Sequence, residues 1–118
     1  MPKNILIADD DAAMLDVYAR LFAGLDYSIS TATSFAEAAR LIDSRNYDLL
    51  ITDLMLGDGM GTDLIKLFEA KQAGARSLLV SGSLSILDPQ QLPPVVIEKP
   101  FKAEVFISEV TKVLSEAR

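Results

Sequence analysis

The sequence predicts an α/β sandwich in which helices cover both faces of a parallel β-sheet. Apolar runs of strand length alternate five times with segments of helical periodicity, a pattern typical of such sheets. No repeat or linker interrupts the pattern, so we expect one domain over residues 1–118. Four of the runs are almost continuously apolar, as expected of strands buried on both faces: residues 4–8, 49–52, 78–80 and 95–97.

The remaining strand and the helices follow from the same periodicities. Residues 27–32 alternate between apolar and polar side chains, which predicts a half-exposed strand at an edge of the sheet. In the segment 83–94, Pro89, Pro93 and Pro94 leave room for about a turn or two of helix. Apolar residues recur at steps of three and four in the other predicted helices, which are residues 11–24, 34–45, 62–73 and 103–116.

Local signals mark several of the helix ends. Ser34 and Glu37 form a capping-box pattern, and Gly24 is placed to end the first helix. Three consecutive aspartates, residues 9–11, follow the first strand. Because an aspartate is favoured at the start of a helix, we assign the last of them, Asp11, to the beginning of the first helix.

Composition excludes several kinds of chemistry. The chain has no cysteine and no histidine, which excludes disulfides, zinc sites built from thiolates or imidazoles, and Ser-His or Cys-His catalytic pairs. The formal net charge of -6 argues against direct binding of nucleic acid. No apolar run approaches the roughly 18 residues of a membrane span, and the N-terminus does not resemble a signal peptide. We therefore expect a soluble, cytoplasmic protein that does not bind membranes.

Polar residues follow the predicted strands at the points where the strands end. Asp9 and Asp10 follow the first strand, Asp53 the third, Ser81 the fourth and Lys99 the fifth. In a parallel sheet these ends meet at one edge, where ligands bind. Carboxylates without imidazole or thiolate partners favour Mg²⁺, and an ammonium and a hydroxyl group suit phosphoryl oxygens. Since a carboxylate can also act as a nucleophile, the pattern predicts a Mg²⁺-dependent aspartyl-phosphate site.

Four blocks of the sequence together carry a family resemblance. "ILIADDD", "DLLITDLMLGDGMG", "LLVSGS" and "EKPF" resemble, in this order, the signature blocks of the receiver domains of bacterial two-component response regulators. The resemblance covers essentially the whole chain and is closest to single-domain, chemotaxis-type regulators. It implies a flavodoxin-like (βα)5 three-layer sandwich with strand order 2-1-3-4-5. The proline-rich segment 83–94 leads us to expect a shortened or irregular fourth helix.

The resemblance also implies a metal site and a phosphorylation site. Asp53 matches the phosphoacceptor, which receives its phosphoryl group from a sensor histidine kinase or a phosphotransfer protein. Asp10, Asp53 and the backbone carbonyl of Met55 match the direct Mg²⁺ ligands, and Asp9 matches a ligand that acts through water. Without a cation, these neighbouring carboxylates are expected to have raised pKa values.

The remaining matched residues would bind the phosphoryl group. Ser81 matches the hydroxyl and Lys99 the ammonium that contact its oxygens, and the Lys99–Pro100 bond is expected to be cis. The resemblance implies a phosphorylatable switch that acts on a downstream protein target. Such a switch catalyses only its own phosphorylation and dephosphorylation, so we do not expect an enzyme in the usual sense.

Two departures from the family pattern leave alternatives open. Gly57 stands where the family usually has proline, so the run "GDGMG" indicates a loose loop, and Val96 stands where the family usually has an aromatic switch residue. One alternative is a degenerate receiver that acts as a phosphorylation-independent interaction module. Another is a small Mg²⁺-dependent phosphohydrolase, but Met55 stands where such enzymes commonly carry a general acid.

Overall fold

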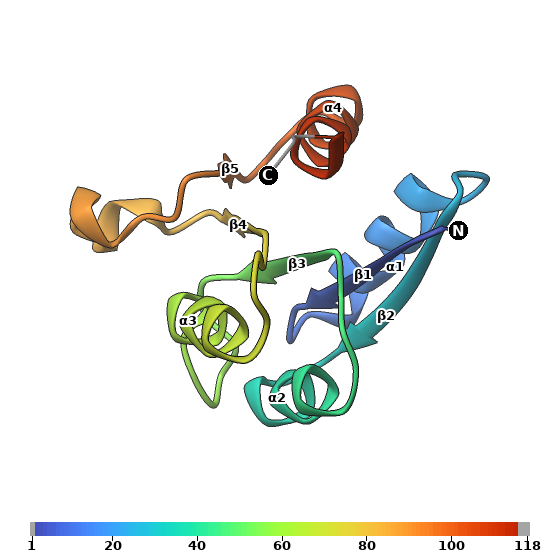
Figure 1. Cartoon of the computed structure of the whole chain (residues 1–118). Coiled ribbons are helices and arrows are strands. Elements are labelled where there is room, and N and C mark those ends of the chain that lie inside the picture. Colours follow the sequence, from blue (N-terminus) through green and yellow to red (C-terminus); the bar gives the residue numbers. More distant parts are fainter. Residues whose placement is uncertain (1, 116–118) are drawn as a thin grey trace.

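The computed structural model describes residues 2–115, except for the side chain of Leu84. Its five strands form one parallel sheet in the order β2-β1-β3-β4-β5 (Figure 1). The predicted order and the edge position of the alternating strand are thereby confirmed. The strands are β1 (Lys3–Ala8), β2 (Tyr27–Ala32), β3 (Leu49–Asp53), β4 (Ser77–Ser81) and β5 (Val96–Glu98).

Helices cover both faces of the sheet, as predicted. The helices α2 and α3 lie on one face, and α1 and α4 lie on the other (Figure 1). Leu6 and Leu50 of the sheet pack in the core beneath α2 and α3. Ile7 and Ile51, their neighbours along the same strands, pack beneath α1 and α4, because successive side chains of a strand point to opposite faces. The helices are α1 (Ala12–Phe22), α2 (Phe35–Ser44), α3 (Gly61–Lys71) and α4 (Ala103–Ser115).

The predicted capping residues start two of these helices. The Asp11 carboxylate accepts a hydrogen bond from the backbone N–H of Ala13 at 2.9 Å, which caps α1. The Ser34 hydroxyl accepts one from the N–H of Glu37 at 3.0 Å, which caps α2. After α1, Gly24 has a φ of 81°, a left-handed conformation that favours glycine at the end of a helix.

The segment between β4 and β5 forms two short 3-10 turns, Leu84–Ile86 and Pro89–Gln91. The expectation of a shortened or irregular fourth helix is therefore confirmed, and the label α4 belongs to the helix after β5. Asp88 accepts a hydrogen bond from the N–H of Gln90 at 3.0 Å, and its own N–H donates to Gln91 Oε1 at 3.0 Å. These local bonds order the second turn where proline prevents a longer helix.

The ends of the observed elements differ from the predicted ones by a few residues. β5 begins one residue later than expected, and α1 ends two residues earlier. The last predicted helical residue, Glu116, lies outside the described residues. Within residues 2–115, no helix combines the length and the apolar character needed to cross a membrane.

The strand register aligns the carboxyl ends of four strands. Ala8 pairs with Thr52, and Asp53 pairs with Val80. Ser81 pairs with Glu98, and the N–H of Lys99 donates to the Ser81 carbonyl oxygen at 3.0 Å. Because the strands are parallel and in this register, the residues that follow β1, β3, β4 and β5 all lie along one edge of the sheet.

Candidate phosphorylation and metal site

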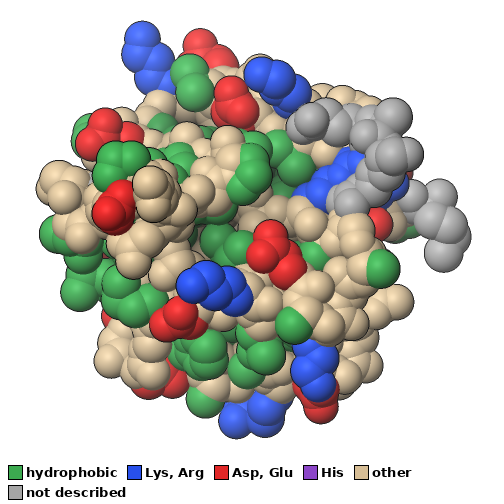
Figure 2. Space-filling view, turned by 60° about the vertical axis from the view of Figure 1, so that its left-hand side comes forward, with side chains coloured by type: hydrophobic (Ala, Val, Ile, Leu, Met, Phe, Trp, Pro, Cys, Tyr) green, Lys and Arg blue, Asp and Glu red, His purple; other side chains and the backbone are tan. Residues whose placement is uncertain are grey.

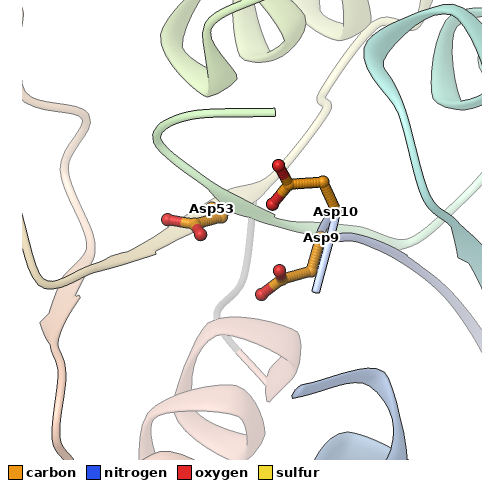
Figure 3. A group of neighbouring side chains, drawn as sticks. All are labelled: Asp9, Asp10 and Asp53. Carbon is orange, nitrogen blue, oxygen red and sulfur yellow. The ribbon is translucent and has the colours of Figure 1, made fainter. Parts of the chain in front are cut away.

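Three carboxylates meet at this edge of the sheet. Asp9 and Asp10 follow β1, and Asp53 is the last residue of β3 (Figure 3). Each of the three offers a carboxylate oxygen, and these oxygens all lie within 4.8 Å of one another. Asp9 is buried, Asp53 is half-buried and Asp10 is exposed, so the group opens to solvent on the side of Asp10. Its oxygen donors are of the hard type that Mg²⁺ prefers.

Lys99 brings a positive charge to two of these carboxylates. Its Nζ lies 3.3 Å from Oδ2 of Asp53 and 3.4 Å from Oδ2 of Asp9. The Lys99 side chain is 22% exposed, and those of Asp53 and Asp9 are 18% and 0% exposed. The Lys99–Pro100 peptide bond is cis, as the resemblance predicted. The Lys99 ammonium group therefore lies against the carboxylates of Asp9 and Asp53 instead of extending into solvent.

Asp9 is held from two directions. Its Oδ1 accepts a hydrogen bond from the backbone N–H of Asp11 at 2.9 Å, and its Oδ2 faces Lys99. The pKa of Asp9 is raised, chiefly because burial disfavours the charged form, and the negative charge of Asp53 adds to the effect. The Asp11 hydrogen bond and Lys99 act in the opposite direction. For Asp9, the predicted raised pKa is thus confirmed.

Burial and the carboxylates also affect a tyrosine of the core. Tyr18 of α1 is 1% exposed, and its ring packs on that of Phe106 with 5.4 Å between the ring centroids. The pKa of Tyr18 is raised, first by burial and then by the negative charges of Asp9 and Asp53. The phenol is therefore neutral at physiological pH, and Tyr18 serves the core, as its helical spacing predicts.

Ser81 and Met55 lie where the strand ends place them. Ser81 is buried, and its hydroxyl oxygen accepts a hydrogen bond from the N–H of Ser83 at 3.0 Å. Met55 follows Asp53 by two residues, pairs with Met60 in an antiparallel bridge and is 52% exposed. Its side chain is therefore largely open to solvent. The role of its carbonyl as a metal ligand stays a prediction.

Two residues that support Asp53 were not predicted from the sequence. The hydroxyl of the buried Thr52 donates to the backbone carbonyl of Asp53 at 2.8 Å. At Gly61, the first residue of α3, a Cβ atom would overlap this same carbonyl oxygen, so a residue without a side chain is required. A glycine directly before the predicted helix 62–73 was the available signal for this close approach. Both contacts fix the backbone that carries the Asp53 carboxylate.

Val96 occupies the position of the usual aromatic switch. It is half-buried and packs against the core beneath α2 and α3. The two aromatic rings that follow β5 in the sequence belong to the other face of the sheet, where Phe101 stacks on Phe106 with 5.0 Å between the ring centroids. Because β5 has no aromatic residue at this position, no ring on this strand can change its orientation in response to a movement of the Ser81 hydroxyl.

A sequence model of the response regulator receiver domain matches residues 5–111 of this chain. The chain belongs to that family. This receiver domain is 32% identical over 80 residues to the acid tolerance regulatory protein ActR of Sinorhizobium medicae, covering 68% of this chain and 41% of ActR. It is 30% identical over 83 residues to the alginate biosynthesis transcriptional regulatory protein AlgB of Pseudomonas putida, covering 70% of this chain and 18% of AlgB. The receiver domain therefore spans less than half the length of these curated relatives.

Solved structures resemble the receiver domain over almost its whole length. A CheY-like response regulator receiver domain protein from Methanospirillum hungatei superimposes with a TM-score of 0.86 and 26% identity, covering 97% of this chain and 94% of that chain. The non-phosphorylated HemR receiver domain of Leptospira biflexa gives a TM-score of 0.86 at 24% identity, covering 100% and 98% of the two chains. The flavodoxin-like fold predicted from the sequence is confirmed by these likenesses.

Proposed function

We propose that this receiver domain is a signalling switch that is phosphorylated on Asp53. The observation that carries the proposal is the grouping of Asp9, Asp10 and Asp53, two of which, Asp9 and Asp53, contact the ammonium group of Lys99. The hard oxygen donors of this group fit Mg²⁺. Asp10, Asp53 and the Met55 carbonyl would hold the ion directly, and Asp9 would hold it through water. When bound, the ion neutralises negative charge shared between carboxylate and phosphoryl oxygens.

In the proposed reaction, an Asp53 oxygen attacks the phosphorus of a phosphohistidine. A new O–P bond forms, the N–P bond breaks, and its electron pair leaves with the imidazole nitrogen. Lys99 stabilises the charge on the phosphoryl oxygens, and the Ser81 hydroxyl donates a hydrogen bond to one of them. In the structure the Ser81 oxygen accepts a hydrogen bond from the N–H of Ser83, which leaves the O–H proton of Ser81 to be donated to the phosphoryl group. Water then attacks the phosphorus of the acyl phosphate, the bond to the Asp53 oxygen breaks, and inorganic phosphate leaves while the carboxylate is restored.

The donor would be a sensor histidine kinase or a phosphotransfer protein. A groove of about 360 Å³ adjoins Lys99 and is lined by Met14 and Val17 of α1 together with Pro100 and Phe101. Its apolar walls beside the ammonium group support the docking of a protein that presents its phosphohistidine to Asp53. The signal would then pass to a downstream protein target.

Direct nucleic acid binding by this domain is not expected. On the face that carries β5 and the two 3-10 turns, Lys and Arg side chains are interspersed with Asp and Glu side chains and with hydrophobic ones (Figure 2). Together with the net charge of -6, this distribution provides little attraction for a phosphate backbone. It suits contact with a protein partner.

Incubation with acetyl phosphate and Mg²⁺, followed by measurement of the intact mass, tests the proposal. Wild-type protein is expected to gain one phosphoryl group and Asp53→Asn none. No adduct on the wild type would instead support the phosphorylation-independent interaction module. That alternative is favoured by Val96, which replaces the usual aromatic switch residue. Sustained turnover of phosphoesters would support a hydrolase. Both of the latter outcomes contradict the proposed switch.

A further inference from the structure

The loop between β3 and α3 carries the run "GDGMG" and is closed on itself. The N–H of Leu56 donates to the carbonyl oxygen of Gly59 at 2.9 Å, and the N–H of Gly61 donates to that of Leu54 at 2.6 Å. Met55 and Met60 pair across the loop. The sequence indicated a loose loop because it has glycine where the family usually has proline. The structure instead shows a compact loop, and contacts between this loop and the rest of the domain set its position.

Asp58, at the tip of this loop, binds the N-terminus of α2. Its Oδ1 accepts a hydrogen bond from the N–H of Phe35 at 2.7 Å, and its Oδ2 accepts one from the N–H of Ala36 at 3.1 Å. The next N–H, that of Glu37, donates to Ser34. The first three free N–H groups of α2 are therefore all satisfied, two of them by a residue from another part of the chain. The same bonds, with that from Phe35 the largest contribution, hold the pKa of Asp58 below its usual value.

Close packing accompanies these hydrogen bonds. A Cβ atom at Gly59 would lie 2.7 Å from Cδ2 of Phe35, so the loop backbone lies directly on this ring. Only glycine allows this approach without displacing the phenylalanine side chain. The loop is thus joined to α2 by two hydrogen bonds to the Asp58 side chain and by a van der Waals contact next to it.

The other side of the loop faces the carboxylates. Gly57 has a φ of 82°, and a Cβ atom built on it would lie 3.5 Å from Oδ2 of Asp10. Met55, whose carbonyl is the expected metal ligand, lies between Asp53 and Gly57 in the sequence. The loop therefore occupies the space between α2 and the carboxylate group, and a shift at its tip would move the backbone beside Asp10.

We propose that Asp58 is a positioning residue for the cation site. By binding the N-terminus of α2, its carboxylate holds the β3–α3 loop so that the Met55 carbonyl and the Gly57 backbone stay beside Asp10 and Asp53. The side chain supplies the restraint that a proline at position 57 would otherwise give to the chain. The inference rests on the proposed Mg²⁺ site, but it concerns a residue that touches neither the ion nor the phosphoryl group.

The test compares Asp58→Ala with two control variants. Ser34→Ala removes an N-terminal hydrogen bond from the same helix without touching the loop. Asp26→Asn removes one negative charge just before β2, at the opposite edge of the sheet from the carboxylates. For each protein, calorimetric titration with MgCl₂ gives the Kd, hydrogen exchange of metal-free protein reports protection of residues 54–60, and thermal unfolding reports stability.

Asp58→Ala is expected to raise the Mg²⁺ Kd roughly tenfold, the lower end of the effect of residues that orient metal ligands. It should also increase exchange in residues 54–60. Ser34→Ala should lower the melting temperature while leaving the Kd and the exchange of the loop as in the wild type. Asp26→Asn should leave the Kd and the exchange of the loop unchanged. Asp58→Asn keeps one acceptor oxygen and should lie between the wild type and Asp58→Ala, which provides a milder variant if alanine prevents folding.

A Kd for Asp58→Ala and Asp58→Asn equal to that of the wild type, with only the melting temperature lowered as in Ser34→Ala, would overturn the inference. Asp58 would then be a helix cap and nothing more. If the wild type itself bound no Mg²⁺, the proposed cation site would fail. In that case, unchanged exchange of residues 54–60 in metal-free Asp58→Ala would separately reject a role in holding the loop.

Discussion

The ammonium group of Lys99 lies 3.3 Å from a carboxylate oxygen of Asp53, at the ends of two strands that are separated in the sheet by β4. The same group lies 3.4 Å from Asp9. Three negative charges at this spacing in a partly buried site repel one another strongly. The single positive charge of Lys99 offsets part of this repulsion. The arrangement leaves Asp10, which is exposed and accepts no hydrogen bond within residues 2–115, open to a cation.

Replacement of Lys99 by methionine should slow phosphorylation by acetyl phosphate by about 100-fold, the usual effect of removing one group that stabilises transition-state charge. Methionine retains most of the side-chain volume and removes only the charge. Lys102→Met, which changes an exposed lysine of the following loop, should phosphorylate at the wild-type rate. The rate is read from intact mass spectra over time, and a Lys99→Met rate within a few-fold of the wild type would show that the ammonium group is not needed.

Mg²⁺ should stabilise the fold, because it relieves repulsion that exists only in the folded protein. At an ion concentration about 100 times the Kd, the free energy of unfolding should increase by about 2.7 kcal/mol. Asp10→Asn should lose this gain, and Asp16→Asn, on the exposed side of α1, should keep it. Thermal unfolding with and without MgCl₂ provides the measurement; a wild-type melting temperature indifferent to millimolar Mg²⁺ would contradict the cation site.

The raised pKa of Asp9 should make metal-free protein less stable as the pH rises. Between the ordinary value of 3.8 and the higher native pKa, the folded state keeps a proton on Asp9 that the unfolded state has lost. Stability therefore falls with rising pH through this interval and is constant above it as far as Asp9 is concerned. Asp9→Asn has no such proton, and its Oδ1 can still accept from the N–H of Asp11.

Urea unfolding in EDTA at several pH values from 4 upward measures this effect. The difference in free energy of unfolding between Asp9→Asn and the wild type should grow in favour of the variant as the pH rises. Parallel curves for the two proteins would mean that Asp9 has the same pKa folded and unfolded.

Bulky Met55 and the small Ser83 should make the phosphorylated state comparatively long-lived. Met55, two residues after Asp53, is half exposed, and its side chain offers no polar group to a water molecule that attacks the acyl phosphate. Met55→Asn should therefore speed dephosphorylation several-fold. Val105→Asn, an equally polar change at an exposed apolar residue of α4, should not. The decay of the intact-mass adduct after removal of acetyl phosphate gives the rates, and an unchanged rate for Met55→Asn would reject this role.

The positions of the five polar site residues could be predicted from the sequence, because each ends a strand or follows one within two residues. The periodicity of the apolar residues defines the strands, and a parallel sheet brings their carboxyl ends to one edge. Asp11 and Ser34 could also be predicted, because an N-cap interacts with residues two or three positions away. These features depend on local order in the chain and on one general rule of topology.

The supports of the site could not be predicted in the same way. Asp58 binds a helix that precedes it by more than twenty positions, and nothing local distinguishes it from a turn residue. The close approach of Gly61 to the Asp53 backbone depends on the path of the loop between them, as does the contact of Gly59 with Phe35. Each is a tertiary contact that involves a glycine-rich loop, for which the sequence indicates flexibility but not what restrains it.

The most direct test of phosphorylation on Asp53 is the location of the phosphoryl group after reaction with acetyl phosphate and Mg²⁺. Borohydride reduces an acyl phosphate of aspartate to homoserine, so peptide sequencing by tandem mass spectrometry marks the modified residue. Homoserine is expected at position 53, and its yield should fall when EDTA replaces Mg²⁺. Homoserine at Asp9 or Asp10 instead, or at no residue of a protein incubated under conditions that fully phosphorylate a control receiver domain, would contradict Asp53 as the phosphoacceptor.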